Sequence, residues 1–177
     1  MASPELLVPN ADDSGWPTGT FADIDETIAS ADADVMATTD AELDDILVLD
    51  FSNSEVVDGD TVTNITVNCR ARVTGIGGKD DLQFEVLIGG SPIGSAVIHT
   101  GVGSSYSTLV CNDTGWNVDQ SAAQMDGIQV RITSQQRAMA ETALFEIDAV
   151  DLVVTFTSGG GGPTIPLAFN HLSMGHH

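Results

Sequence analysis

Paired carboxylates are the feature of this 177-residue sequence that could most readily do chemistry. Several short stretches carry two acidic residues within three positions, and hard cations such as Ca²⁺, Mg²⁺ and Na⁺ prefer such oxygen ligands. The candidate ligands are Asp12, Asp13, Asp23, Asp25, Asp32, Asp34, Asp58 and Asp60. None of the pairs has the spacing of an EF-hand loop. Because more than one residue in ten is Asp, composition alone also produces such pairs, and both interpretations stay open.

Motifs of enzyme chemistry are missing from the sequence. It contains no Walker-type phosphate loop, no His-Glu-x-x-His, no Cys-x-x-Cys and no Gly-x-Ser-x-Gly. Of the four histidines, His99 ends an expected strand, and His171, His176 and His177 lie in the C-terminal segment. A catalytic group needs a rigid support, which a terminal segment does not provide. We therefore expect no enzymatic activity and no cofactor apart from a cation at the acidic loops.

The charge balance is strongly negative. Twenty-six Asp and Glu face five Lys and Arg, so the formal net charge is −21, and Lys79 is the only lysine. Such a surface repels nucleic acid and anionic lipid, and it also repels itself unless salt screens it. At about 1 M salt the screening length falls to roughly 3 Å. The composition resembles that of proteins from extremely halophilic archaea, the alternative being an acidic domain from ordinary salt.

The strand expected over residues 61–73 is the element around which the others are organised. From Ile65 to Val73 its apolar side chains alternate strictly with polar ones, as in a strand with one buried face. The polar face carries Arg70 and Arg72, two of the chain's four arginines. Because guanidinium groups pair best with carboxylates, we expect both to meet carboxylates of the same sheet or of a neighbouring subunit.

Further strands are expected over residues 46–51, 82–88, 93–99, 106–111, 128–132 and 144–157, separated by turns rich in Gly, Asn and Asp. In the last one the apolar phase changes near Asp148, which predicts a β-bulge. Seven or eight short strands without a long helix predict an all-β fold, an antiparallel β-sandwich of jelly-roll type.

Cysteines and hydropathy bear on the environment. Cys69 and Cys111 fall on apolar strand faces, which suits free buried thiols or a bond across the sandwich, and we expect free thiols. The sequence shows neither a secretory signal nor an apolar run of the roughly 20 residues that a membrane helix needs. We expect a soluble protein that folds in the cytoplasm and binds neither nucleic acid nor membrane.

The domain organisation follows from Pro and Gly. Residues 1–20 are expected to form an extended N-terminal arm, in which Trp16 is a candidate interface residue that packs on the core or on a neighbouring subunit, and residues 21–157 are expected to form the sandwich. Residues 158–162 are a glycine-rich linker, and residues 163–177 form a tail in which Ile165, Leu167 and Phe169 alternate. We expect this tail to lie along an adjacent subunit of a homo-oligomer, a trimer or a pentamer.

A family resemblance supports an assembly role. The motifs that carry it are Gly15-Trp16, Ile24-Asp25-Glu26, Cys69-Arg70-Ala71-Arg72, Thr114-Gly115-Trp116 and Gly127-Ile128-Gln129-Val130-Arg131-Ile132. Over residues 12–157 the chain resembles a β-sandwich domain of virion proteins of tailed viruses. With the acidic composition, the resemblance implies a structural component of a virus of a halophilic archaeon: a capsid decoration, turret or minor tail protein. It also implies synthesis in the host cytoplasm, contact with partners such as the major capsid protein, and no catalytic residues.

The alternative interpretation is a carbohydrate-binding sandwich used in host adhesion or on a cell surface. Such modules stack sugars on exposed aromatic rings, and this chain offers Trp16, Trp116, Tyr106 and six phenylalanines. Exposed tryptophans lying side by side would favour sugar binding. Burial of these rings against another chain would favour assembly.

Overall fold

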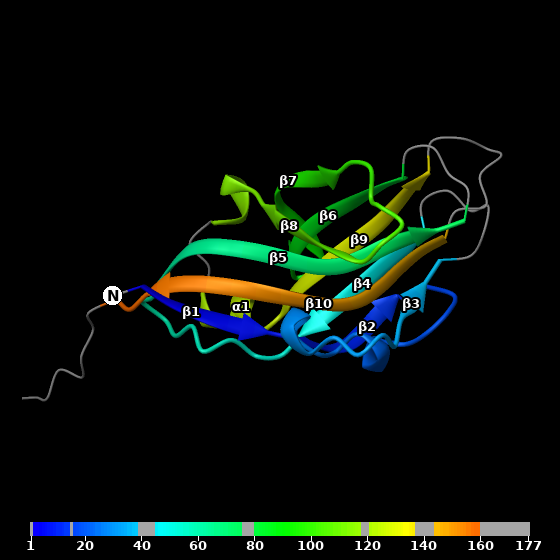
Figure 1. Cartoon of the computed structure of the whole chain (residues 1–177). Helices are drawn as coiled ribbons and strands as arrows, with labels where there is room; N and C mark the ends of the chain where they lie inside the picture. Colours follow the sequence, from blue (N-terminus) through cyan, green and yellow to red (C-terminus); the bar gives the residue numbers. More distant parts are fainter. Residues whose placement is uncertain are drawn as a thin grey trace, which may run out of the picture.

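The computed structural model describes residues 2–14, 16–38, 45–75, 80–117, 121–136 and 144–159, which form two five-stranded sheets packed face to face (Figure 1). Sheet A has the order β1 (Ala2–Leu7), β10 (Leu144–Thr157), β5 (Thr61–Thr74) and β8 (Ser107–Asn112), with β3 (Met36–Ala37) also paired to β10. Sheet B has the order β2 (Pro9–Ser14), β4 (Ile46–Phe51), β9 (Ile128–Gln136), β6 (Asp80–Ile88) and β7 (Ser91–His99). These strand pairs are antiparallel, so the predicted all-β sandwich of jelly-roll type is confirmed.

The two long strands β5 and β10 form the centre of sheet A. The inward face of β5 is fully buried at Ile65, Val67 and Cys69, as the alternation predicts. In β10 the register shifts between Ile147 and Ala149. Asp148 is thus the extra residue of a β-bulge, as the phase change of the sequence indicated.

The expectation of an N-terminal arm outside the sandwich was wrong for residues 2–14, which form the strands β1 and β2. β1 pairs with β10 from Ala2–Thr157 to Leu7–Leu152, and β2 pairs with β4. The prolines of this segment do not prevent pairing because both strands lie at sheet edges, where a missing N–H costs no ladder hydrogen bond. The sandwich therefore begins with the first strand.

Both tryptophans belong to the protein's own core. Trp16 is 3% exposed and Trp116 is 0% exposed. Each indole N–H donates to a main-chain carbonyl, Trp16 to Asp45 at 3.3 Å and Trp116 to Ser95 at 3.0 Å. Trp16 therefore anchors its segment to this chain rather than to a neighbour.

The two cysteines are free and buried, as expected. Burial raises the pKa of Cys111 to about 12 and raises that of Cys69 well above its ordinary value. Because the thiolate is the nucleophilic form, both side chains act as small apolar core residues.

Short helical turns connect the strands: η1 (Phe21–Asp23), η2 (Ile28–Ser30), η3 (Thr114–Trp116) and α1 (Ala122–Met125). The segment 24–34, which includes η2, lies against the outer face of sheet A at β5 and β10 (Figure 1). In the described parts of the chain, no helix has the length and apolarity of a membrane span. The tail 163–177, with Ile165, Leu167 and Phe169, and most of the linker 158–162 lie outside the described residues.

Candidate functional site

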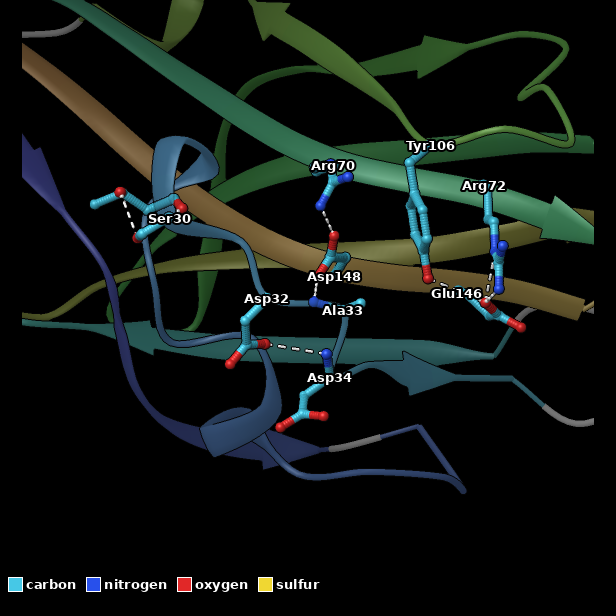
Figure 2. A network of polar contacts seen from close by, with 10 residues as sticks. Ser30, Asp32, Ala33, Asp34, Arg70, Arg72, Tyr106, Glu146 and Asp148 are labelled. Atoms are coloured by element: carbon cyan, nitrogen blue, oxygen red, sulfur yellow. Dashed lines mark hydrogen bonds and ion pairs between the residues drawn. The ribbon is translucent and has the colours of Figure 1, made fainter.

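The outer face of sheet A carries a polar network made of Arg70, Arg72, Tyr106, Glu146 and Asp148, which we call the outer network (Figure 2). Arg70 of β5 forms an ion pair with Asp148 in the bulge of β10. Arg72 binds Glu146 through Nε and Nη2, at 2.7 and 2.6 Å from the same carboxylate oxygen. Both arginines thus meet carboxylates of their own sheet, as one of the two sequence-based alternatives proposed.

Tyr106 lies between the two guanidinium groups (Figure 2). Its ring centroid is 4.9 Å from Cζ of Arg70 and 4.4 Å from Cζ of Arg72, and its hydroxyl donates to Glu146 at 3.1 Å. Burial raises the pKa of Tyr106, and the hydrogen bond to Glu146 adds to this effect. Cation–π contacts of this kind occupy the ring. The ring is therefore not open for stacking against a ligand.

Two buried carboxylates of β10 hold the segment 24–34 against the sheet. The Ala33 N–H donates to Asp148 Oδ1 at 2.9 Å, and the Ile28 N–H donates to Asp151 Oδ2 at 3.1 Å. Asn68 donates to the other oxygen of Asp151 at 2.7 Å. Ala33 has a left-handed backbone with φ of 78°, which a non-glycine residue adopts only at a cost. The two carboxylates thus stabilise a conformation that the segment would not adopt alone.

Three carboxylates meet where this segment touches the bulge: Glu26, Asp32 and Asp148, whose ligand oxygens lie within 4.8 Å of one another. Oε1 of Glu26 is buried without a hydrogen-bond partner among the described residues. Burial raises the pKa of Glu26, and the negative charges of Asp32 and Asp25 raise it further. Oxygens in this arrangement could ligate a small hard cation.

The structure brings only one of the eight predicted ligands, Asp32, into this group, which is the one carboxylate group of its kind in the described residues. Asp13, next to Asp12 on β2, accepts a hydrogen bond from the Gln129 side chain at 2.7 Å. Several others accept main-chain N–H groups: Asp23 from Thr20, Asp58 from Ala122, and Asp60 from Val57 and Gly159. Among the described residues, the structure therefore shows no group of three carboxylates to support the other predicted cation ligands, Asp12, Asp13, Asp23, Asp25, Asp34, Asp58 and Asp60.

Comparisons with known proteins place the chain no further than its fold. No family model matches the sequence, and no curated protein matches it. Among solved structures, a family 16 carbohydrate-binding module is 9% identical with a TM-score of 0.41, covering 70% of this chain and 78% of its own. A xylan-binding module, CBM15, is 14% identical with a TM-score of 0.41, and the match covers 89% of this chain and 97% of that module. A chain in the structure of infectious bursal disease virus Gx strain is 11% identical with a TM-score of 0.46, and the match covers 91% of this chain and 33% of the viral chain. Likenesses this distant supply no argument for function.

The Glu26→Gln variant should be more stable than the wild type above pH 4.5, the ordinary pKa of this carboxyl group. Because the folded-state pKa is raised, ionisation of Glu26 costs folding free energy at higher pH, and the amide removes that cost. We expect a gain of about 0.5 to 1 kcal/mol at pH 7, measured by thermal unfolding with a chelator present. The gain should vanish below pH 4.5, where the carboxyl group is protonated in both states.

Glu55→Gln is the matched control, because Glu55 is exposed, and it should leave stability nearly unchanged. A loss of stability in Glu26→Gln under chelating conditions would contradict the account of this carboxylate group. Repeating the pair with added Ca²⁺ tests the cation directly, since an ion bound here would stabilise the wild type more than the variant.

Proposed function

We propose that the chain is a non-enzymatic structural component of a virion, a capsid decoration, turret or minor tail protein of a tailed virus that infects a halophilic archaeon. In this proposal it is made in the host cytoplasm and works by assembling with copies of itself and with other virion proteins such as the major capsid protein. The single observation that carries the proposal over sugar binding is that Trp16 and Trp116 lie in the protein's own core, while the half-buried Tyr106 lies between Arg70 and Arg72.

This enclosure bears directly on the sugar-binding alternative. The chain has two tryptophans and one tyrosine, and stacking on a sugar needs an open aromatic face. Both tryptophans lie in the core, and Tyr106 lies between Arg70 and Arg72. Four phenylalanines are buried as well, Phe51, Phe84, Phe145 and Phe156, so among the described residues an adhesion module would have to recognise its glycan mainly through polar side chains. The enclosed rings count against the sugar-binding alternative and leave assembly as the better supported role.

The charge supports the proposed environment. A net charge of −21 keeps copies apart at low salt, whereas molar salt screens the repulsion to within a few ångströms, roughly 3 Å. An acidic assembly component is therefore suited to brine. The same charge disfavours nucleic acid and anionic membranes as partners.

Particle composition tests the proposal. Particles of the virus that encodes the chain, purified on a density gradient in molar salt, should contain the chain at a fixed ratio to the major capsid protein by quantitative mass spectrometry. In parallel, the purified chain should show no saturable binding to a panel of cell-surface polysaccharides. Absence from the particles together with saturable binding to one polysaccharide would replace the proposal with the adhesion alternative.

A further inference from the structure

In the described residues, sheet A ends at β1 and the short β3 on one side and at β8 on the other, and sheet B ends at β2 and β7. The outer side of β3 is already paired, through Ala37 with Thr18. An edge strand exposes a row of unpaired N–H and C=O groups on which another chain can pair. Proteins usually protect such edges with proline, with charged side chains, with bulges or with a covering segment. The four edges of this chain differ in these devices.

In sheet A, β1 is protected. It contains Pro4 and Glu5. The Glu5 carboxylate accepts hydrogen bonds from the Ser54 hydroxyl and the Glu55 N–H, both at 2.7 Å. The segment that begins at Ser52 therefore lies beside this edge.

In sheet B, both edges are protected. β2 contains Pro9, Asp12 and Asp13, and its pairing with β4 has two register shifts. β7 contains Pro92 and is covered by η3, where the Ser95 N–H donates to Asp113 at 3.2 Å and the Ser95 carbonyl accepts from Trp116 at 3.0 Å.

Strand β8 shows none of these devices among the described residues. Its sequence, Ser107-Thr108-Leu109-Val110-Cys111-Asn112, contains neither proline nor charge, and its pairing with β5 has no register shift. Leu109 and Cys111 point into the core, whereas Val110 is 64% exposed. Within the described parts of the chain, no hydrogen bond reaches the side of β8 that faces away from β5.

The charge pattern favours a second copy of the chain as the occupant of this edge. Residues 86–112, which include β7 and β8, contain no Asp, Glu, Lys or Arg, in a chain whose net charge is −21. A second copy is repelled by most of the surface but meets no like charge along β8. An uncharged strand is also compatible with itself, because antiparallel pairing brings no like charges opposite each other.

We propose that β8 pairs antiparallel with β8 of a second copy, so that the two A sheets continue across a two-fold axis. Such an isologous contact closes as a dimer and satisfies the open edges of both copies at once. The inference deepens the proposed function, on which it rests for its biological setting, by naming the surface of self-assembly. This contact is a dimer contact, and the trimer or pentamer expected from the sequence would need a second surface.

The Val110→Asp variant tests the contact, because it puts a like charge into the centre of the paired edge while replacing an exposed side chain. We expect light scattering in molar salt to give twice the 18.4 kDa chain mass for the wild type and the single-chain mass for the variant. Leu6→Asp is the matched control: Leu6 lies on β1 at the opposite edge of the same sheet and is 49% exposed. It should remain dimeric, and circular dichroism should show all three proteins folded.

Hydrogen exchange gives a second readout, since main-chain amides in residues 107–112 should exchange more slowly in the wild type than in Val110→Asp. A monomeric wild type, or a Val110→Asp protein with the wild-type mass, overturns the inference. Either result leaves the particle-composition test of the proposed function unaffected. Absence of the chain from particles would conversely leave the dimer contact standing.

Discussion

Replacing Arg70 with Met should lower the free energy of unfolding by about 3 kcal/mol, because the substitution leaves the Asp148 carboxylate buried without its cation. The Asp148 side chain is 0% exposed and that of Arg70 is 31% exposed. Because Arg70 is partly solvated, the loss of stability should lie at the lower end of the range for breaking a buried ion pair. The Ala33 N–H would remain as a partner but does not neutralise the charge. The variant also loses the contact between the guanidinium group and Tyr106. Thermal unfolding in molar salt measures the loss.

Arg131→Met is the matched control on sheet B. Arg131 pairs with Glu85 at 2.7 Å, with side chains that are 30% and 14% exposed, so water can solvate the carboxylate after the substitution. We expect a loss below about 1 kcal/mol. Adding Asp148→Asn to Arg70→Met should recover part of the stability, because the amide carries no charge to bury. Equal losses in the two arginine variants would contradict the assigned role of Asp148.

Dialysis from molar salt to about 0.1 M should cost the protein most of its β-structure, as followed by circular dichroism. The screening length grows from about 3 Å to about 10 Å over this range, so carboxylates several residues apart begin to repel one another. With a net charge of −21, this repulsion acts against the compact state over the whole surface. An unchanged spectrum and melting temperature at low salt would remove the case for a halophilic setting.

A charge-reduced variant separates repulsion from other effects of salt. Asp25, Asp34 and Asp126 are exposed, and replacing all three with Asn lowers the magnitude of the net charge by three. The variant should unfold at a lower salt concentration than the wild type. An identical salt midpoint would mean that the requirement for salt does not arise from surface repulsion.

The sequence predicted the strands that have a strong local pattern and missed those that do not. The alternation from Ile65 to Val73 and the phase change at Asp148 are local signals, and both features are present. β1 and β2 have no such pattern, since Pro4, Glu5 and Pro9 interrupt them. Their pairing with β10 and β4 is a long-range contact that no local pattern encodes.

The candidate site was predictable only in part for a related reason. The need of Arg70 and Arg72 for carboxylates follows from charge, but their partners depend on the register between β5 and β10. Asp148 joins Glu26 and Asp32 although more than a hundred positions separate it from either. Adjacent acidic pairs in the sequence suggested the wrong ligands, because a cation site needs oxygens that converge in space rather than along the chain.

Cryo-electron microscopy of purified particles in molar salt can show whether the chain is a structural component of a virion. We expect density for the two-sheet sandwich at symmetry-related positions on the head, the turret or the tail. Particles on which every outer density is assigned to other proteins, with this chain left in the soluble fraction of infected cells, would contradict the claim.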